Sequence, residues 1–146
     1  MEKFISESAS DTVRIGKEFA KKLKAGDAVL YRGEMGAGKT YFTKGIAKAF
    51  GIAEEITSPT FALINEYYGE LNIFHFDLFR ITGFDDLYGI GFFDYFDRNG
   101  ILCIEWSENV PDIAEYFDTA YEVDIRKIGD ERREIFIDNI KRKQVC

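Results

Sequence analysis

The order of hydrophobic and polar residues along this chain predicts strands of two kinds. Segments 27–32 and 101–104 are apolar through their middle, which is typical of strands buried on both faces of a sheet. Other segments come in pairs separated by turn residues, and these pairs predict antiparallel hairpins. The pairs are 61–68 with 71–76, joined at Gly69-Glu70, and 121–126 with 134–138, joined around Gly129-Asp130. Residues 4–6 are expected to form a short edge strand.

Two further segments carry apolar residues every three or four positions, which predicts amphipathic helices. The first helix is expected to begin near Ser10 or Asp11, either of which can cap free N–H groups, and Gly26 supplies its stop. The second follows residue 40 and ends at Gly51. Gly45 lies inside this second helix and costs up to about 1 kcal/mol relative to Ala. Tertiary packing must therefore stabilise the second helix.

Residues 82–99 are rich in Phe, Tyr and Asp and are expected to form two short helices that cover one side of the sheet. Their aromatic side chains either pack in the core or form a docking face, since exposed aromatic residues are favoured at interfaces. Pro111 is expected to begin another short helix, which runs through Tyr116. The end of the chain, 140–146, is expected to be a solvated, frayed tail; contact of its basic residues with RNA is the alternative.

Composition limits the domain count and the kinds of partner. A chain of 146 residues, 46% of them hydrophobic, can bury the core of one domain, which we expect to span residues 1–146. The net charge of −7 disfavours a protein that grips nucleic acid by itself, because Lys and Arg supply most of that affinity. The sequence shows neither an export signal nor a long apolar run, so we expect a cytoplasmic protein without a membrane span. Cys103 is expected to be a buried thiol rather than half of a disulfide.

Residues 33–40, Gly-Glu-Met-Gly-Ala-Gly-Lys-Thr, match the phosphate-binding pattern G-x-x-x-x-G-K-[ST] between a strand and a helix. Such a loop points backbone N–H groups and the positive end of a helix at one small volume. A chance match is disfavoured because the strand, the glycines, the Lys-Thr pair and the helix all coincide. We expect a nucleoside triphosphate to be bound by Glu34, Met35, Gly36, Ala37, Gly38, Lys39, Thr40 and Tyr41, with Lys39 on the β- and γ-phosphates and Thr40 on Mg²⁺.

The segment after this helix contains a second polar stretch, Thr57-Ser-Pro-Thr60. In a P-loop NTPase such a stretch is either a mobile segment that senses the γ-phosphate or a simple connecting loop, and the pattern leaves both open. The next strand ends in His75-Phe-Asp77, where a carboxylate can reach a bound metal through water. The lone His75 is interpreted as a hydrogen-bonded structural residue in preference to a metal ligand.

Glu105 follows four apolar residues, Ile101-Leu-Cys-Ile104, in a Walker B-like arrangement. The carboxyl end of a buried parallel strand lies near bound phosphates in α/β folds. A glutamate there is suited to orienting an attacking water or to holding the hydration shell of the metal. Whether Asp77 or Glu105 lies nearer the metal is left open by the sequence. Trp106, directly after Glu105, is either a strand-end anchor or part of the site.

Together these motifs resemble the bacterial TsaE family, also called YjeE, a small ATPase required for making threonylcarbamoyladenosine in tRNA. The resemblance covers about residues 5–126 in the order of the family. Its specific part lies outside the phosphate loop, in Gly26-Asp27, Ser58-Pro-Thr-Phe61, Asn65-Glu-Tyr67, His75-Phe-Asp-Leu78 with Arg80, and Ile104-Glu-Trp106. Mild departures occur at Tyr31, Glu34, Phe79 and Ser107, none of them at a presumed catalytic position.

The resemblance implies a three-layer, P-loop NTPase-like α/β domain with a central mixed β-sheet. It implies hydrolysis of ATP to ADP and phosphate, with Lys39, Asp77 and Glu105 as catalytic residues. Mg²⁺ would lie at Thr40, Asp77 and Glu105, and the nucleotide would also contact Thr60 and Trp106. Family members hydrolyse ATP weakly alone and act with the TsaB–TsaD heterodimer, in which TsaD modifies the adenosine. The chain would meet tRNA only through that complex, and alone it would be a monomer or weakly self-associated.

Two other functions are compatible with a phosphate loop. One is a small-molecule kinase, which is disfavoured because there is no arginine-rich lid and little chain left for an acceptor pocket. The other is an interaction module whose nucleotide site binds without turnover. A GTPase is disfavoured because no Asn-Lys-x-Asp segment is present to read guanine.

Overall fold

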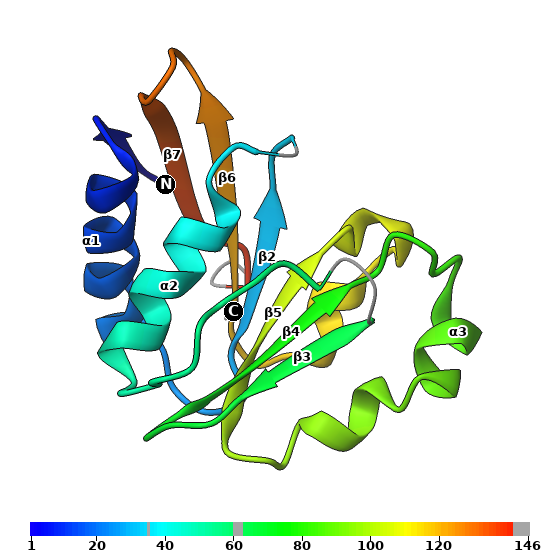
Figure 1. Cartoon of the computed structure of the whole chain (residues 1–146). Helices are drawn as coiled ribbons and strands as arrows, with labels where there is room; N and C mark the ends of the chain where they lie inside the picture. Colours follow the sequence, from blue (N-terminus) through cyan, green and yellow to red (C-terminus); the bar gives the residue numbers. More distant parts are fainter. Residues whose placement is uncertain (35, 60–62, 142–146) are drawn as a thin grey trace.

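The computed structural model describes residues 1–34, 36–59 and 63–141, and within these residues seven strands form one mixed sheet (Figure 1). The order of the strands across the sheet is β1-β7-β6-β2-β5-β4-β3. The strands are β1 (Glu2–Ser6), β2 (Ala28–Arg32), β3 (Ile64–Tyr67), β4 (Asn72–Asp77), β5 (Gly100–Glu105), β6 (Ala120–Lys127) and β7 (Arg133–Asn139).

The centre of the sheet is parallel and its two ends are antiparallel. β6, β2, β5 and β4 run in the same direction, whereas β3 pairs with β4, β7 with β6, and β1 with β7 in antiparallel fashion. The register places Leu30 opposite Ile104 and Asp77 opposite Glu105. The carboxyl ends of β2, β5 and β4 therefore meet at one edge of the sheet. Both predicted hairpins and the predicted mixed sheet are confirmed, although β3 is shorter than the predicted strand 61–68, of which residues 61 and 62 lie outside the described part of the chain.

Helices cover both faces of the sheet (Figure 1). α1 (Ala9–Phe19) and α2 (Lys39–Ala49) lie on one face, and α3 (Phe84–Gly89) lies on the other. The face of α3 also carries the 3₁₀ turns Phe92–Tyr95, Ser107–Asn109 and Ile113–Tyr116. This arrangement confirms the predicted three-layer α/β fold. Across the described part of the chain, no helix is both long and apolar enough to span a membrane.

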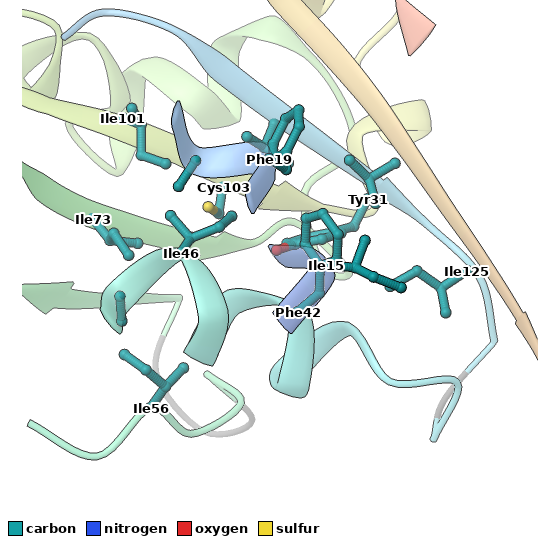
Figure 2. Close-up of a cluster of buried hydrophobic side chains, with 14 of the residues drawn as sticks. Ile15, Phe19, Tyr31, Phe42, Ile46, Ile56, Ile73, Ile101, Cys103 and Ile125 are labelled. Carbon is teal, nitrogen blue, oxygen red and sulfur yellow. The ribbon is translucent and has the colours of Figure 1, made fainter. Parts of the chain in front are cut away.

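The alternation of side chains along each strand divides the interior into two cores. In β2, Val29 and Tyr31 join the core under α1 and α2, whereas Ala28 and Leu30 join the core under α3. Figure 2 shows the first of these cores. Helix residues Ile15, Phe19, Phe42 and Ile46 pack there with sheet residues Tyr31, Ile73, Ile101, Cys103 and Ile125. The prediction that β2 and β5 are buried on both faces is thereby confirmed.

The aromatic residues of 82–99 are divided between core and surface. Phe92 is fully buried in the second core and contacts the ring of Phe76, at 5.0 Å between ring centroids. Phe84 and Tyr88 are instead exposed, Tyr88 to 70%, and their rings contact each other and that of Phe93. Core packing is thus confirmed for part of the set, while a docking face stays a prediction for the exposed rings.

Helix α1 begins at Ala9, near the predicted start, but the predicted capping residue and the predicted end were both wrong. Its cap is Ser8, whose Oγ accepts a hydrogen bond from the N–H of Asp11 at 3.1 Å. The hydroxyl of Ser6 donates to the Ser8 carbonyl at 2.8 Å, which fixes the turn before the helix and makes the cap fall earlier than Ser10. The α-helix ends at Phe19 and a 3₁₀ turn follows, so Gly26, at φ 91°, belongs to the turn that enters β2.

Two predictions near the end of the chain also need correction. Pro111 does not begin a helix; Asp112, at φ 63°, precedes the 3₁₀ turn Ile113–Tyr116. The start of the predicted tail is tied down rather than frayed, because Lys141 Nζ forms an ion pair with Glu115 at 3.2 Å. The N–H of Ile140 also donates to the carbonyl of Ala120. Residues 142–146 lie outside the described part of the chain.

Helices α1 and α2 cross closely at two glycines. A Cβ added at Gly45 would lie 2.1 Å from the carbonyl oxygen of Val13, and one at Gly16 would lie 2.3 Å from that of Phe42. Both distances are far below contact distance, and both neighbours are backbone atoms that cannot rotate away. Only glycine permits this crossing, so the packing of the two helices offsets the low helix propensity of Gly45.

We predict that Gly45→Ala destabilises the fold although Ala favours a helix. The helix-propensity gain of about 1 kcal/mol is smaller than the cost of separating two packed helices, so the free energy of unfolding falls by about 2 kcal/mol or more. Urea unfolding followed by circular dichroism measures this change. Gly89→Ala is the matched control, because a Cβ at Gly89 meets nothing within 4 Å. Stabilisation by both substitutions would contradict the close crossing.

Candidate nucleotide-binding site

The loop between β2 and α2 has the backbone that the glycine pattern predicts. Gly33, Gly36 and Gly38 all have positive φ, at 128°, 80° and 119°. A Cβ at Gly33 would lie 2.4 Å from the carbonyl oxygen of Ile125 on β6, so only glycine fits where the chain leaves the sheet. At Gly36 the space around the position of a Cβ is open. Met35 lies outside the described residues.

The N-terminus of α2 offers free hydrogen-bond donors. Its cap is Gly38, and no described side chain caps the first turn, unlike α1, where Ser8 does. The first N–H groups of an α-helix have no partner within the helix and attract anions. Thr40 and Tyr41 lie in this turn, where Thr40 is half-buried and Tyr41 is exposed. The Nζ of Lys44 lies over the Tyr41 ring, 5.1 Å from its centroid. The open Gly36 position and the uncapped helix end together fit a phosphate group.

Lys39 joins the loop to the end of β5. Its Nζ donates to the carbonyl of Gly33 at 3.0 Å and forms an ion pair with Glu105 Oε1 at 3.2 Å. The Lys39 side chain therefore folds back over the loop and reaches the neighbouring strand. The two residues that the sequence assigned to phosphate binding and to water activation are in direct contact.

Glu105 is nearly buried, at 9% exposure, and has a second partner in His75 on β4. His75 Nε2 lies 2.7 Å from Glu105 Oε2, and His75 is fully buried. Burial raises the pKa of the Glu105 carboxyl, but the interactions with His75, and after them those with Lys39, outweigh burial and hold the pKa below its ordinary value. The carboxylate is therefore ionised at neutral pH. The interpretation of His75 as a hydrogen-bonded residue is confirmed.

Asp77 lies beside Glu105 in the register of β4 and β5 but has a local partner. Its Oδ1 accepts a hydrogen bond from the N–H of Phe79 at 2.9 Å and so shapes the turn that follows β4. Asp77 is half-buried at the same sheet edge as the loop. The structure thus brings Lys39, Glu105 and Asp77 to one edge, with Glu105 as the carboxylate that contacts Lys39. Thr60, predicted in the switch-like loop, lies outside the described residues.

Trp106 continues the chain from Glu105 in a left-handed conformation, with φ of 62°. Its ring is 43% exposed and meets the ring of Phe79 edge-on, at 5.0 Å between centroids. The turn after it is held by Arg32, whose guanidinium donates to Ser107 Oγ at 3.1 Å and to Glu108 at 2.7 Å. Trp106 is therefore not buried as a strand-end anchor, and a contact of its ring with the nucleotide stays a prediction.

Arg133 contacts the loop, and sequence reasoning missed it. From the start of β7 its Nε donates to the carbonyl of Ala37 at 2.6 Å, and its Nη2 lies 3.5 Å from that of Gly36. Its Nη1 donates to carbonyls of the β6–β7 turn, including that of Gly129 at 3.3 Å. Arg133 thus braces the loop from the side of the β6–β7 hairpin. No motif marks it, because its partners are backbone carbonyls distant in sequence.

A buried polar chain joins β2 to the first turns of α2. Tyr31 Oη lies 2.6 Å from Thr43 Oγ1, which donates to the carbonyl of Lys39 at 2.9 Å. Burial raises the pKa of Tyr31 far above its ordinary value, so the phenol stays neutral. Cys103, beneath the same helix, is a free and fully buried thiol, as expected, and burial raises its pKa. Neither side chain carries a charge into the site.

Comparison with known proteins identifies the family. The model of the family described as threonylcarbamoyl adenosine biosynthesis protein TsaE matches residues 6–135. This chain belongs to the TsaE family. The TsaE protein of Treponema pallidum is 40% identical over 134 residues, which are 91% of this chain and 97% of that protein. The TsaE protein of Bacillus subtilis is 36% identical over 126 residues, which are 86% of this chain and 77% of that protein.

A solved structure of a TsaE-family relative has the same fold. The crystal structure of Bacillus subtilis YdiB matches this chain with a TM-score of 0.74 at 31% sequence identity. The match covers 97% of this TsaE-family chain and 87% of YdiB. The resemblance inferred from the motifs is thereby confirmed, both as a family and as an α/β fold.

We predict that Glu105 makes stability depend on acid pH. Because its folded pKa lies below its unfolded pKa, its contribution is present above about pH 4.3, the ordinary value for Glu, and is lost as pH falls through the lower folded pKa. In that range the wild type loses up to about 1.4 kcal/mol per pH unit more than Glu105→Gln. Urea unfolding at several pH values measures both slopes. The exposed Glu131→Gln controls for the lost charge, and equal slopes for wild type and Glu105→Gln would refute the effect.

We predict that Arg133→Met loosens the loop. Hydrogen bonds from a charged donor contribute roughly 1.5–3 kcal/mol, so amides of residues 33–41 should exchange with deuterium about tenfold faster. Hydrogen exchange with mass spectrometry measures this rate. Arg126→Met, which removes an exposed guanidinium paired with Asp124, is the control and should leave the loop unchanged. Identical loop exchange in wild type and Arg133→Met would show that the brace has no effect.

Proposed function

We propose that this TsaE-family chain is a small ATPase that hydrolyses ATP to ADP and phosphate in support of threonylcarbamoyladenosine biosynthesis. The observation that carries the proposal is the Lys39–Glu105 contact at 3.2 Å, which joins a phosphate-binding loop to an ionised carboxylate. A triphosphate on the loop would place its outer phosphate between these two side chains. Lys39 would then exchange its carboxylate partner for phosphate oxygens, and Glu105 would face the water that attacks.

The binding half of the proposal is supported by the loop. Gly36, Gly38 and the uncapped start of α2 supply backbone N–H groups for phosphate oxygens, and Lys39 supplies a charge. Glu34, Ala37 and Tyr41 complete the loop and its first helical turn, and the exposed Trp106 directly follows Glu105 in the sequence. We assign nucleotide binding to this set.

The metal half of the proposal follows from the acids and the hydroxyl at the same edge. Bound Mg²⁺ would neutralise charge on the phosphates. In the described residues no three His, Cys, Asp or Glu side chains gather closely enough to hold a metal by themselves. This fits Mg²⁺, which usually binds through one or two protein groups, phosphate oxygens and water. We assign Thr40 to the metal directly, and Asp77 and Glu105 to its surroundings.

The biological setting is proposed from the family. We propose that the chain acts with TsaB and TsaD homologues and meets tRNA only through them, in the cytoplasm. The net charge of −7 supports an indirect contact with tRNA, because a polyanion is not attracted by an acidic surface. We also propose that the chain alone is a monomer or weakly self-associated, with slow turnover until its partners bind.

We predict that two substitutions separate binding from hydrolysis. Lys39→Ala should abolish ATP binding, because it removes the charge on the phosphates. Glu105→Ala should leave binding nearly intact and slow hydrolysis by on the order of 100-fold, the loss of about 3 kcal/mol of transition-state stabilisation. Calorimetry with ATP and phosphate release with excess Mg²⁺-ATP measure the two steps, each with and without the TsaB–TsaD pair.

The exposed Glu131→Ala serves as the matched control for loss of a carboxylate and should behave as wild type. Wild-type turnover in Glu105→Ala would reject the role of Glu105. ATP binding without phosphate release in the wild type, even with the TsaB–TsaD pair, would favour an interaction module. Rapid transfer of phosphate to a nucleoside, nucleotide or sugar in a screen would favour a kinase.

A further inference from the structure

We infer that His75 is a positioning residue for Glu105, holding Oε2 so that Oε1 is presented to the nucleotide. This inference rests on the proposed ATPase function and adds a residue to it. His75 is the single histidine of the chain, is fully buried, and lies 2.7 Å from Glu105 through Nε2. The carboxylate thus has one partner on each oxygen, because Lys39 Nζ binds Oε1.

The fold fixes the geometry of this pair. β4 and β5 are adjacent parallel strands, and His75 is opposite Cys103, so Glu105, two residues further on, points to the same face of the sheet. Cys103 and Ile73 both belong to the core under α2, which places His75 and Glu105 beneath that helix. The ring of Tyr31 lies against the imidazole, at 6.2 Å between centroids. His75 is therefore held by packing as well as by its hydrogen bond.

The two ring nitrogens of His75 have different surroundings. Nδ1 is buried and has no hydrogen-bond partner among the described residues. Nε2 lies 2.7 Å from Glu105 Oε2, and because an ionised carboxylate oxygen only accepts hydrogen bonds, the hydrogen lies on Nε2. His75 therefore donates to Glu105 through Nε2.

Nucleotide binding would displace one of the two partners of Glu105 and leave the other in place. Lys39 belongs to the phosphate loop, and in the proposed ATP complex its ammonium moves to phosphate oxygens. His75 belongs to the core of the sheet and keeps its place. Glu105 Oε1 would then be free for water or for the metal's hydration shell, while Oε2 stays anchored. Without His75, the buried Glu105 carboxylate would have lost both protein partners once Lys39 had moved to the phosphate, which is the step at which its orientation toward water matters.

We predict that His75→Phe, which keeps a ring but no donor, lowers turnover by about 10- to 100-fold, the range seen when a residue that orients a functional side chain is lost. The dissociation constant for ATP should stay within about threefold, since among the described residues the hydrogen bond of His75 goes to Glu105 and not to the loop that binds phosphate. His75→Gln, whose amide N–H can reach the carboxylate, should recover part of the turnover. Ile73→Val on the same strand controls for loss of core packing and should leave turnover unchanged.

A double substitution tests whether His75 acts through Glu105. In a Glu105→Ala background, His75→Phe should cause no further loss of turnover, because the group that it positions is absent. An equal fractional loss in both backgrounds would overturn the inference and indicate a general structural role. A parallel weakening of ATP binding in His75→Phe would do the same.

Nitrogen-15 NMR of the untagged protein tests the geometry without turnover. The single histidine should carry hydrogen on Nε2, and Glu105→Gln should shift its Nε2 resonance. An Nε2 without hydrogen, or an Nε2 resonance indifferent to Glu105→Gln, would overturn the inference. Absence of ATP hydrolysis in the wild type would refute the proposed function alone, because the NMR result would still decide whether His75 holds Glu105.

Discussion

The ionised carboxylate of Glu105 is the constraint on which the site depends. Moving a carboxylate out of water costs several kcal/mol unless charges and hydrogen bonds compensate. The chain supplies that compensation from two directions, with Lys39 of the phosphate loop on one oxygen and His75 of β4 on the other. The loop, β5 and β4 are therefore linked at one edge of the sheet, and a change in any of them alters the surroundings of the carboxylate.

Close packing places that carboxylate where the loop can reach it. Gly33 allows the loop to leave β2 against the backbone of β6, and Gly45 with Gly16 allows α2 to lie against α1. Tyr31 and Thr43 then tie β2 to the carbonyl of Lys39 through a buried hydrogen-bonded chain. The backbone around Lys39 is thus held by contacts with β6, α1 and β2. Interiors packed this tightly transmit small shifts instead of absorbing them.

Local patterns predicted the parts of the site that lie within one segment. The phosphate loop, the strand ending in Glu105 and the place of Asp77 follow from glycine spacing and apolar runs. Contacts between segments could not be predicted from such patterns. Arg133 binds backbone carbonyls, which every residue has, so no residue type marks its partners. The role of His75 depends on its neighbour Glu105 on β5, which the sequence around His75 does not reveal. The cap of α1 was missed for a related reason, since Ser6 on β1 decides it.

The ion pair between Lys39 and Glu105 has an energetic consequence for the proposed ATPase. In the proposed ATP complex Lys39 would turn from the Glu105 carboxylate to phosphate oxygens, so part of the phosphate interaction would be offset by the broken ion pair. In the proposed mechanism that cost would fall on binding, whereas the freed oxygen would face the attacking water. The site would then bind ATP less tightly than its donors allow, and arrival of the phosphate would be coupled to release of Glu105 Oε1. With the hydrogen bond from β4 kept, only one partner of the carboxylate would change, and the carboxylate would stay in place.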